Sequence, residues 1–96
     1  MDQTKFNQLL LVSKPKEVDR RALELYGKPT YLSTRKNKKY MIENDDGKLI
    51  HFGDIRFQDA TFHKDAFRIR RFKQRNRKWA NAYEYSPAYL SYHLLW

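Results

Sequence analysis

The sequence has 96 residues, which is enough for one domain with a modest core. A content of 41% hydrophobic and 16% aromatic residues excludes a disordered tail, and the absence of cysteine excludes a disulfide framework, a thiolate metal site and a cysteine nucleophile. The 20 Lys and Arg residues outnumber the 11 Asp and Glu residues. The resulting formal net charge of +9 favours a polyanionic partner, which can be nucleic acid, anionic lipid or an acidic protein surface.

Residues 1–26 are predicted to form an N-terminal helical segment in two pieces. Thr4 is a candidate cap for a first short turn. Pro15 suits the first turn of a second helix, whose apolar residues recur near the helical period over residues 18–26 until Gly27 ends it. The longest apolar run, residues 9–12, is far shorter than the roughly 20 residues that span a bilayer, so we expect no membrane span.

Residues 27–60 change to the pattern of strands. Tyr31 and Leu32 lie in a short extended stretch, and residues 40–42 and 49–52 read as two longer strands. The sequence Asn-Asp-Asp-Gly at residues 44–47 is a strong turn signal, because these residue types tolerate the left-handed conformations that tight hairpins need. A β-hairpin is therefore predicted here.

Residues 61–96 return to helical spacing. Apolar residues at steps of three and four from Phe62 to Trp79 predict one helix, with Asp59 or Thr61 as its cap. Ser86 and Pro87 then have the order of a cap and a first-turn proline, which predicts a short apolar helix running toward the C-terminus.

Together these elements predict a small single α+β domain. Its sheet is a β-hairpin, or a three-stranded antiparallel sheet if the segment around Tyr31 pairs with the hairpin, packed by helices before and after it. We divide the chain into the N-terminal helical segment 1–26 and an α+β domain at 27–96.

The positive charge is concentrated in the last third of the chain. Residues 61–96 carry eight bases and two acids, and seven of the eleven residues from 68 to 78 are Lys or Arg. Such a run without acids repels itself, so a negatively charged partner is expected to neutralise it, although a solvated helix face is the alternative. A second basic cluster lies in the loop before the hairpin. The candidate residues for binding a polyanion or partner are Arg35, Lys36, Lys38, Lys39, Arg68, Arg70, Arg71, Lys73, Arg75, Arg77 and Lys78.

The aromatic residues admit two interpretations. Phe52, Phe57, Phe62, Phe67, Phe72 and Trp79 can either pack in the core or offer stacking surfaces for single-stranded bases. Their helical or core spacing favours packing. Trp96, at the end of the chain, either folds back on the core or anchors into a neighbouring subunit, and we take it as a candidate partner anchor.

The sequence offers no strong case for an enzyme. His51, His63 and His93 do not have the spacing of a zinc-binding pair, and the three isolated glycines form no phosphate-binding loop. Asp54 and Asp59 are expected to cap backbone amides or to pair with basic residues such as Arg56. We therefore expect neither a catalytic residue, nor a metal, nor a cofactor. A meeting of His51 or His63 with a carboxylate in a cleft is the observation that would reopen the question.

Several motifs in order suggest a family. The stretches LSTRKNKKYM, HFG, HKD, and YSPAYLSYHLLW, within residues 27–96, resemble a family of small proteins from large DNA viruses of eukaryotes, without an assigned activity. The resemblance implies a virion component, such as a minor capsid or cement protein located in the particle and contacting other capsid proteins. The alternative is a viral protein that binds nucleic acid, such as the viral DNA, without sequence preference. A small enzyme is a weaker third hypothesis.

Overall fold

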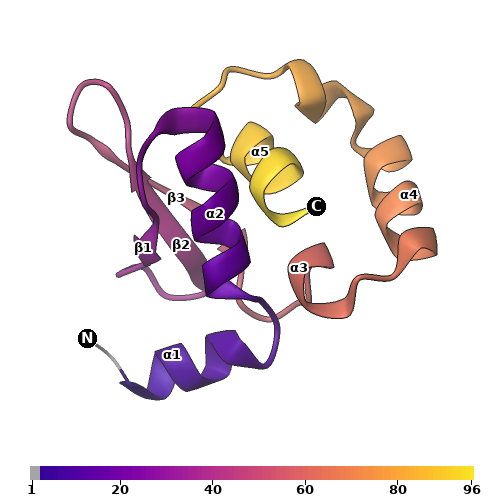
Figure 1. The fold of residues 1–96 in the computed structure, drawn as a ribbon, viewed down its shortest axis with the longest axis horizontal. Helices are drawn as coiled ribbons and strands as arrows, with labels where there is room; N and C mark the ends of the chain where they lie inside the picture. The colour runs from indigo at the N-terminus through magenta and orange to yellow at the C-terminus, as the bar shows by residue number, and fades with distance from the viewer. Residues whose placement is uncertain (1–2) are drawn as a thin grey trace.

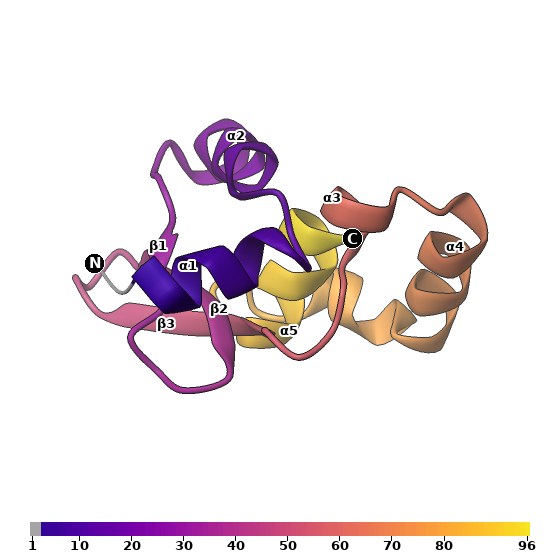
Figure 2. The same ribbon diagram turned by 90° about the horizontal axis from the view of Figure 1, so that it is seen from below.

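The fold is a small α+β domain in which helices flank a three-stranded antiparallel sheet (Figures 1 and 2). The computed structural model describes residues 3–96. In chain order the elements are α1 (Gln3–Leu10), α2 (Pro15–Tyr26), β1 (Tyr31–Leu32), β2 (Lys38–Glu43), β3 (Leu49–Asp54), α3 (Ala60–His63), α4 (Ala66–Arg75), the 3₁₀ helix η1 (Arg77–Asn81), α5 (Pro87–Leu90) and the π-helical turn η2 (Ser91–Leu95).

The sheet has the order β1-β2-β3, which confirms the three-stranded alternative. Tyr40 pairs with Phe52 across the hairpin, and Leu32 of β1 pairs with Tyr40 on its other side. The Asn44 side chain accepts hydrogen bonds from the backbone amides of Asp46 and Lys48, so it holds the turn as the sequence predicts.

Helix α2 begins and ends where the sequence predicts. Pro15 lies in its first turn, and Gly27 ends it in the left-handed conformation with its amide donating to the carbonyl of Leu23. The C-terminal helix is also confirmed, because the Ser86 side chain accepts a hydrogen bond from the Tyr89 amide ahead of α5.

The prediction of one helix from Phe62 to Trp79 is wrong. The chain forms α3, α4 and η1 in succession, with a break at Lys64, which adopts the left-handed conformation at φ 52°. Asp65 then starts α4 by accepting hydrogen bonds from the amides of Phe67 and Arg68. A continuous helix would have left no place for this cap.

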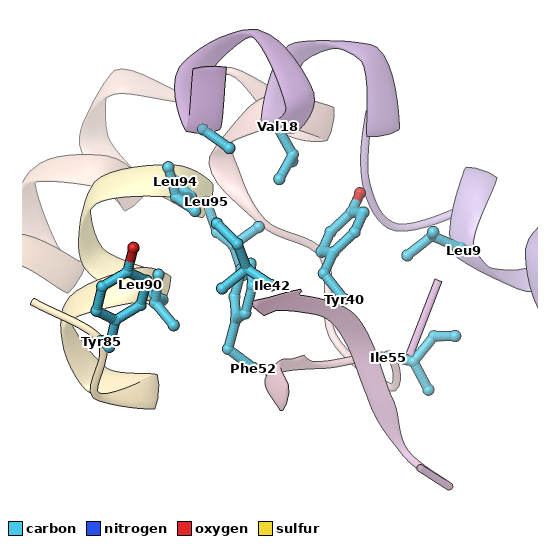
Figure 3. Close-up of a cluster of buried hydrophobic side chains, with 11 residues drawn as sticks. Leu9, Val18, Tyr40, Ile42, Phe52, Ile55, Tyr85, Leu90, Leu94 and Leu95 are labelled. Atoms are coloured by element: carbon cyan, nitrogen blue, oxygen red, sulfur yellow. The ribbon is translucent and has the colours of Figure 1, made fainter. Parts of the chain in front are cut away.

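The core lies between the sheet, α2 and the C-terminal α5–η2 segment. Tyr40, Ile42 and Phe52 of the sheet are buried with Val18 of α2 and with Leu90, Leu94 and Leu95 of the C-terminal segment (Figure 3). Leu9, Val18 and Ala22 come from residues 1–26, so both predicted segments of the chain share this core; residues 1 and 2 of the first segment lie outside the described residues. Within residues 3–96, no helix is both long and apolar enough to cross a membrane.

Candidate functional site

A cleft of about 750 Å³ lies between α4 and the rest of the molecule, and we call it the α4 cleft. In both ribbon views α4 lies at one end of the molecule, with the α5 region between it and the sheet (Figures 1 and 2). One wall is α4 with Trp79, and the opposite side is formed by the ends of β2 and β3, the turn that follows β3, and α5 with η2. A volume of this size is within the range of roughly 300–1,000 Å³ that is usual for ligand sites.

Helix α4 presents a row of arginines to the cleft. Arg68, Arg71 and Arg75 line it at positions i, i+3 and i+7, which lie on one face of a helix. The helix has no buried residue, so its position depends on the Asp65 cap and on a few aromatic contacts rather than on a core of its own. The cleft wall is therefore basic and accessible.

None of these three arginines forms an ion pair with a carboxylate in the described chain. Arg68 donates to the Gln58 side chain at 3.3 Å, and the Arg71 guanidinium lies 5.7 Å from the centre of the Phe67 ring. Both contacts are with uncharged groups. The positive charge of the wall thus remains available to a ligand.

The acidic residue of the cleft, Asp54, is paired with Arg56. Arg56 donates two side-chain hydrogen bonds to its carboxylate, at 2.8 and 3.0 Å, and these lower the pKa of Asp54 to about 2. This confirms the expected pairing of Asp54 with Arg56. Lys38, which lines the same side of the cleft, also lowers the pKa of Asp54.

Three aromatic rings that line the cleft pack against one another where α4 meets the C-terminus. Trp96 stacks on Phe72 with ring centroids 4.2 Å apart and planes 5° from parallel, and Trp79 meets Phe72 edge-on at 5.8 Å. Trp96 also lies 5.1 Å from the His63 ring. The structure shows the Trp96 ring folded back on its own chain, and its role as a partner anchor stays a prediction.

Phe57 lines the cleft from the turn after β3, and its side chain is 65% exposed. Phe67 is 61% exposed on α4. The expectation that the aromatic residues pack is confirmed for the buried Phe52 but is wrong for Phe57 and Phe67. Phe57 follows the end of β3 and Phe67 lies at the start of α4, and the neighbouring elements leave both rings uncovered. The sequence leaves Phe57 as a candidate stacking surface but favours packing for it. Its place beside Arg56, after the Gly53-Asp54 strand end, was the available signal for exposure.

Lys39 does not belong to the exposed basic surface, which corrects its assignment as a binding residue. Its side chain is 2% exposed, and its ammonium group donates to the Asp59 carboxylate at 2.9 Å. Burial lowers the pKa of Lys39, while the neighbouring Asp59 opposes that shift. Asp59 also accepts from the amide and hydroxyl of Thr61, so it caps α3 as predicted and holds Lys39 inside the fold.

The remaining predicted cations are divided between the cleft and other surfaces. Arg35 and Lys36 are exposed on the loop between β1 and β2, three and two residues before Lys38. Lys73 lies over the Tyr92 ring at 5.3 Å. Arg70, Arg77 and Lys78 are exposed as well, and like Arg35 and Lys36 they do not line the cleft.

The hydrogen bonds of His51 and His63 are with uncharged groups. His51 shares a buried hydrogen bond of 2.7 Å with the Ser33 hydroxyl, and His63 accepts through Nδ1 from the backbone amide of Asp65. Neither ring is hydrogen-bonded to a carboxylate within residues 3–96, and that part of the chain contains no cluster of three or more residues that could ligate a metal.

The chain is a small α+β protein with a cleft lined by basic and aromatic residues. The chain belongs to a family of unknown function, DUF5754, whose family model matches residues 29–76. The match extends from the segment before β1 through the sheet to the end of α4, so it contains the three cleft arginines. No curated protein and no solved structure matches the chain.

Proposed function

We propose that this chain binds nucleic acid without sequence preference through the α4 cleft. The observation that carries the proposal is the row of Arg68, Arg71 and Arg75, which face a concave surface without a carboxylate partner in the described chain. Arginine is the side chain best suited to phosphate, because its planar guanidinium donates two parallel hydrogen bonds.

The basic surface extends from the cleft toward the β1–β2 loop. Lys38 lines the cleft, and Arg35 and Lys36 precede it in the sequence by three and two residues. Three residues of extended chain span about 10 Å, so both cations lie within that distance of Lys38 along the chain. Phosphates spaced along a nucleic-acid backbone can therefore meet both basic clusters. Contacts of this kind fix the position of a nucleic acid but carry no sequence information.

Nucleic acid fits the cleft better than an acidic protein surface does, because the arginines share it with Phe57, Trp79 and the Phe72–Trp96 stack. Cationic and aromatic side chains together match a ligand that carries both phosphates and flat bases. The sequence has no zinc finger, basic zipper or RNA-recognition signature, so we expect backbone-directed binding.

Fluorescence anisotropy with labelled oligonucleotides of several sequences tests the proposal. We expect similar affinities across sequences and, for a single strand held by Lys38 and the three arginines, a log–log salt slope of about −3. The cleft variant Arg68→Gln/Arg71→Gln/Arg75→Gln should lower affinity more than tenfold. The matched variant Arg70→Gln/Arg77→Gln/Lys78→Gln removes the same charge outside the cleft and should cost about threefold or less. No binding by the unmodified chain would contradict the function, and equal losses in the two variants would contradict the site.

We propose further that the protein is a structural component of the particle of a large DNA virus, where it contacts other capsid proteins as well as packaged DNA. The resemblance of residues 27–96 to small viral proteins supports this context. Exposed apolar side chains away from the cleft, Leu11 on the α1–α2 connection and Leu23 and Leu25 on α2, are 69%, 52% and 53% exposed and suit a protein contact. Quantitative mass spectrometry of purified particles should detect the chain in stoichiometric copies; its restriction to infected-cell lysate would contradict the proposal.

A further inference from the structure

We infer that the α4 cleft holds single-stranded nucleic acid, with phosphates on the arginine row and bases stacked against Phe57 and Trp79. This inference rests on the proposed nucleic-acid binding and names the form of nucleic acid that the site selects. The inference follows from three observations: the exposed Phe57 ring, the row of arginines on α4, and the concave shape of the cleft.

Phe57 has the exposure that a stacking surface needs. Its side chain lines the cleft but is 65% exposed, so most of the ring is not used in packing. A phenylalanine exposed to this extent at the edge of a cavity is a surface onto which the face of a base can be laid. Stacking of this kind does not depend on the identity of the base, because every base has a π-face.

The arginine row has the arrangement needed to follow a backbone. Arg68 and Arg75 are separated by seven residues of α4, which is about 10 Å along the helix axis, and Arg71 lies between them on the same face. Phe57 lines the same cleft from the turn after β3, and Trp79 lines it from the segment that follows α4. A strand lying along α4 can therefore place phosphates on one wall while its bases turn toward the aromatic side chains.

A double helix cannot use the cleft in this way. Its bases are stacked on one another inside the duplex, so their faces are closed to Phe57 and Trp79. Its phosphates lie on a convex cylinder, whereas Arg68, Arg71 and Arg75 line a concave site. A duplex would instead meet the outer surface of this region, where Arg70 and Arg77 are exposed away from the cleft.

The test compares an oligothymidylate of about 15 nucleotides with a mixed-sequence duplex of the same length, at one salt concentration, by fluorescence anisotropy. We expect the single strand to bind at least about tenfold more tightly. Phe57→Ala should weaken single-strand binding about tenfold, because each stacked base contributes roughly this factor, and should leave duplex binding unchanged.

Tyr83→Ala is the matched control, since Tyr83 is 69% exposed and does not line the cleft. It should change single-strand binding less than about twofold, and circular dichroism should show both variants folded because neither ring is buried. Equal affinity for the two probes, or unchanged single-strand binding by Phe57→Ala, overturns the inference while the proposed function stands. Failure of both probes to bind overturns the proposed function itself. Displacement of the oligothymidylate by inorganic polyphosphate at equal phosphate concentration would also overturn the inference, because it would mean that charge alone provides the affinity.

Discussion

The indole ring of Trp96 stacks face to face on the Phe72 ring, 4.2 Å away between centroids and 5° from parallel. This contact joins the last residue of the chain to the middle of α4, a helix without a buried residue. Phe72 is also in edge contact with Trp79. The C-terminus therefore holds the basic wall of the α4 cleft in position against the body of the molecule.

Trp96→Ala should loosen α4 more than it affects the sheet. We expect a loss of about 2 kcal/mol in the free energy of unfolding, less than for a fully buried tryptophan because the ring is only partly buried. Amide hydrogen exchange should accelerate in α4 while β2 and β3 keep their protection. Trp96→Phe retains an aromatic ring and should restore most of the protection. Unchanged exchange in α4 after Trp96→Ala would show that the stack does not hold the helix.

Gly53→Ala should destabilise the protein by roughly 2 kcal/mol. Gly53 has φ +80°, and a Cβ there would lie 2.9 Å from Leu95 Cδ1 and 3.2 Å from two carbons of Lys39. Gly47→Ala is a matched control, since Gly47 has φ +78° but no neighbour within 4 Å of an added Cβ. It should cost about 1 kcal/mol, from the backbone conformation alone. Urea denaturation measures both, and equal losses would contradict the close packing described at Gly53.

The buried Lys39–Asp59 pair should be sensitive to removal of one partner. Lys39→Met leaves a buried carboxylate without its cation, and we expect it to lower the free energy of unfolding by about 3 kcal/mol or more. The double variant Lys39→Met/Asp59→Asn should recover part of this loss. Lys38→Met is the control, because Lys38 is partly exposed and forms no ion pair within residues 3–96. Similar stabilities for the Lys39 and Lys38 variants would contradict the burial of the pair.

The free energy of unfolding should decrease when the pH is lowered through the ordinary titration range of histidine. Burial, together with the nearby charges of Arg35, Lys5 and Lys38, lowers the pKa of His51 below its reference value of 6.5. The unfolded chain therefore takes up a proton at a pH where the folded chain does not, which favours unfolding as the pH falls from about 6.5 toward the lowered pKa. Burial also lowers the pKa of His63, so its effect has the same sign.

Urea denaturation between about pH 7.5 and about pH 5.5 measures this dependence. His51→Gln should flatten the curve, with the remaining slope assigned to His63. A free energy of unfolding that rises over this range as the pH is lowered, or a slope unchanged by His51→Gln, would contradict the assignment.

The local elements could be predicted because their signals lie within a few residues. The Asn44–Gly47 turn, Pro15 with Gly27, and Ser86 with Pro87 each specify a turn or a helix end by short-range chemistry. The helix predicted from Phe62 to Trp79 was wrong because the apolar spacing continues across the break at Lys64. The signal that marks this break is Asp65, a residue type that caps helices.

The site could be predicted only in part, because its geometry depends on contacts between distant segments. The basic composition of α4 is visible in the sequence, but its cleft requires α4 to face the end of β3 and the C-terminal segment. Lys39 and Lys38 are neighbours in one basic run, yet Lys39 is buried by Asp59, which lies twenty residues further along the chain. Only the fold distinguishes these two lysines.

The most direct test of the central claim is an NMR titration of the isotopically labelled protein with oligothymidylate. The side-chain Nε–Hε signals of Arg68, Arg71 and Arg75 and the indole N–H signal of Trp79 should shift most, because these groups line the cleft. The corresponding signals of Arg70 and Arg77, which lie outside it, should shift little. Shifts concentrated on Arg70 and Arg77, or spread evenly over all five arginines, would contradict binding in the α4 cleft.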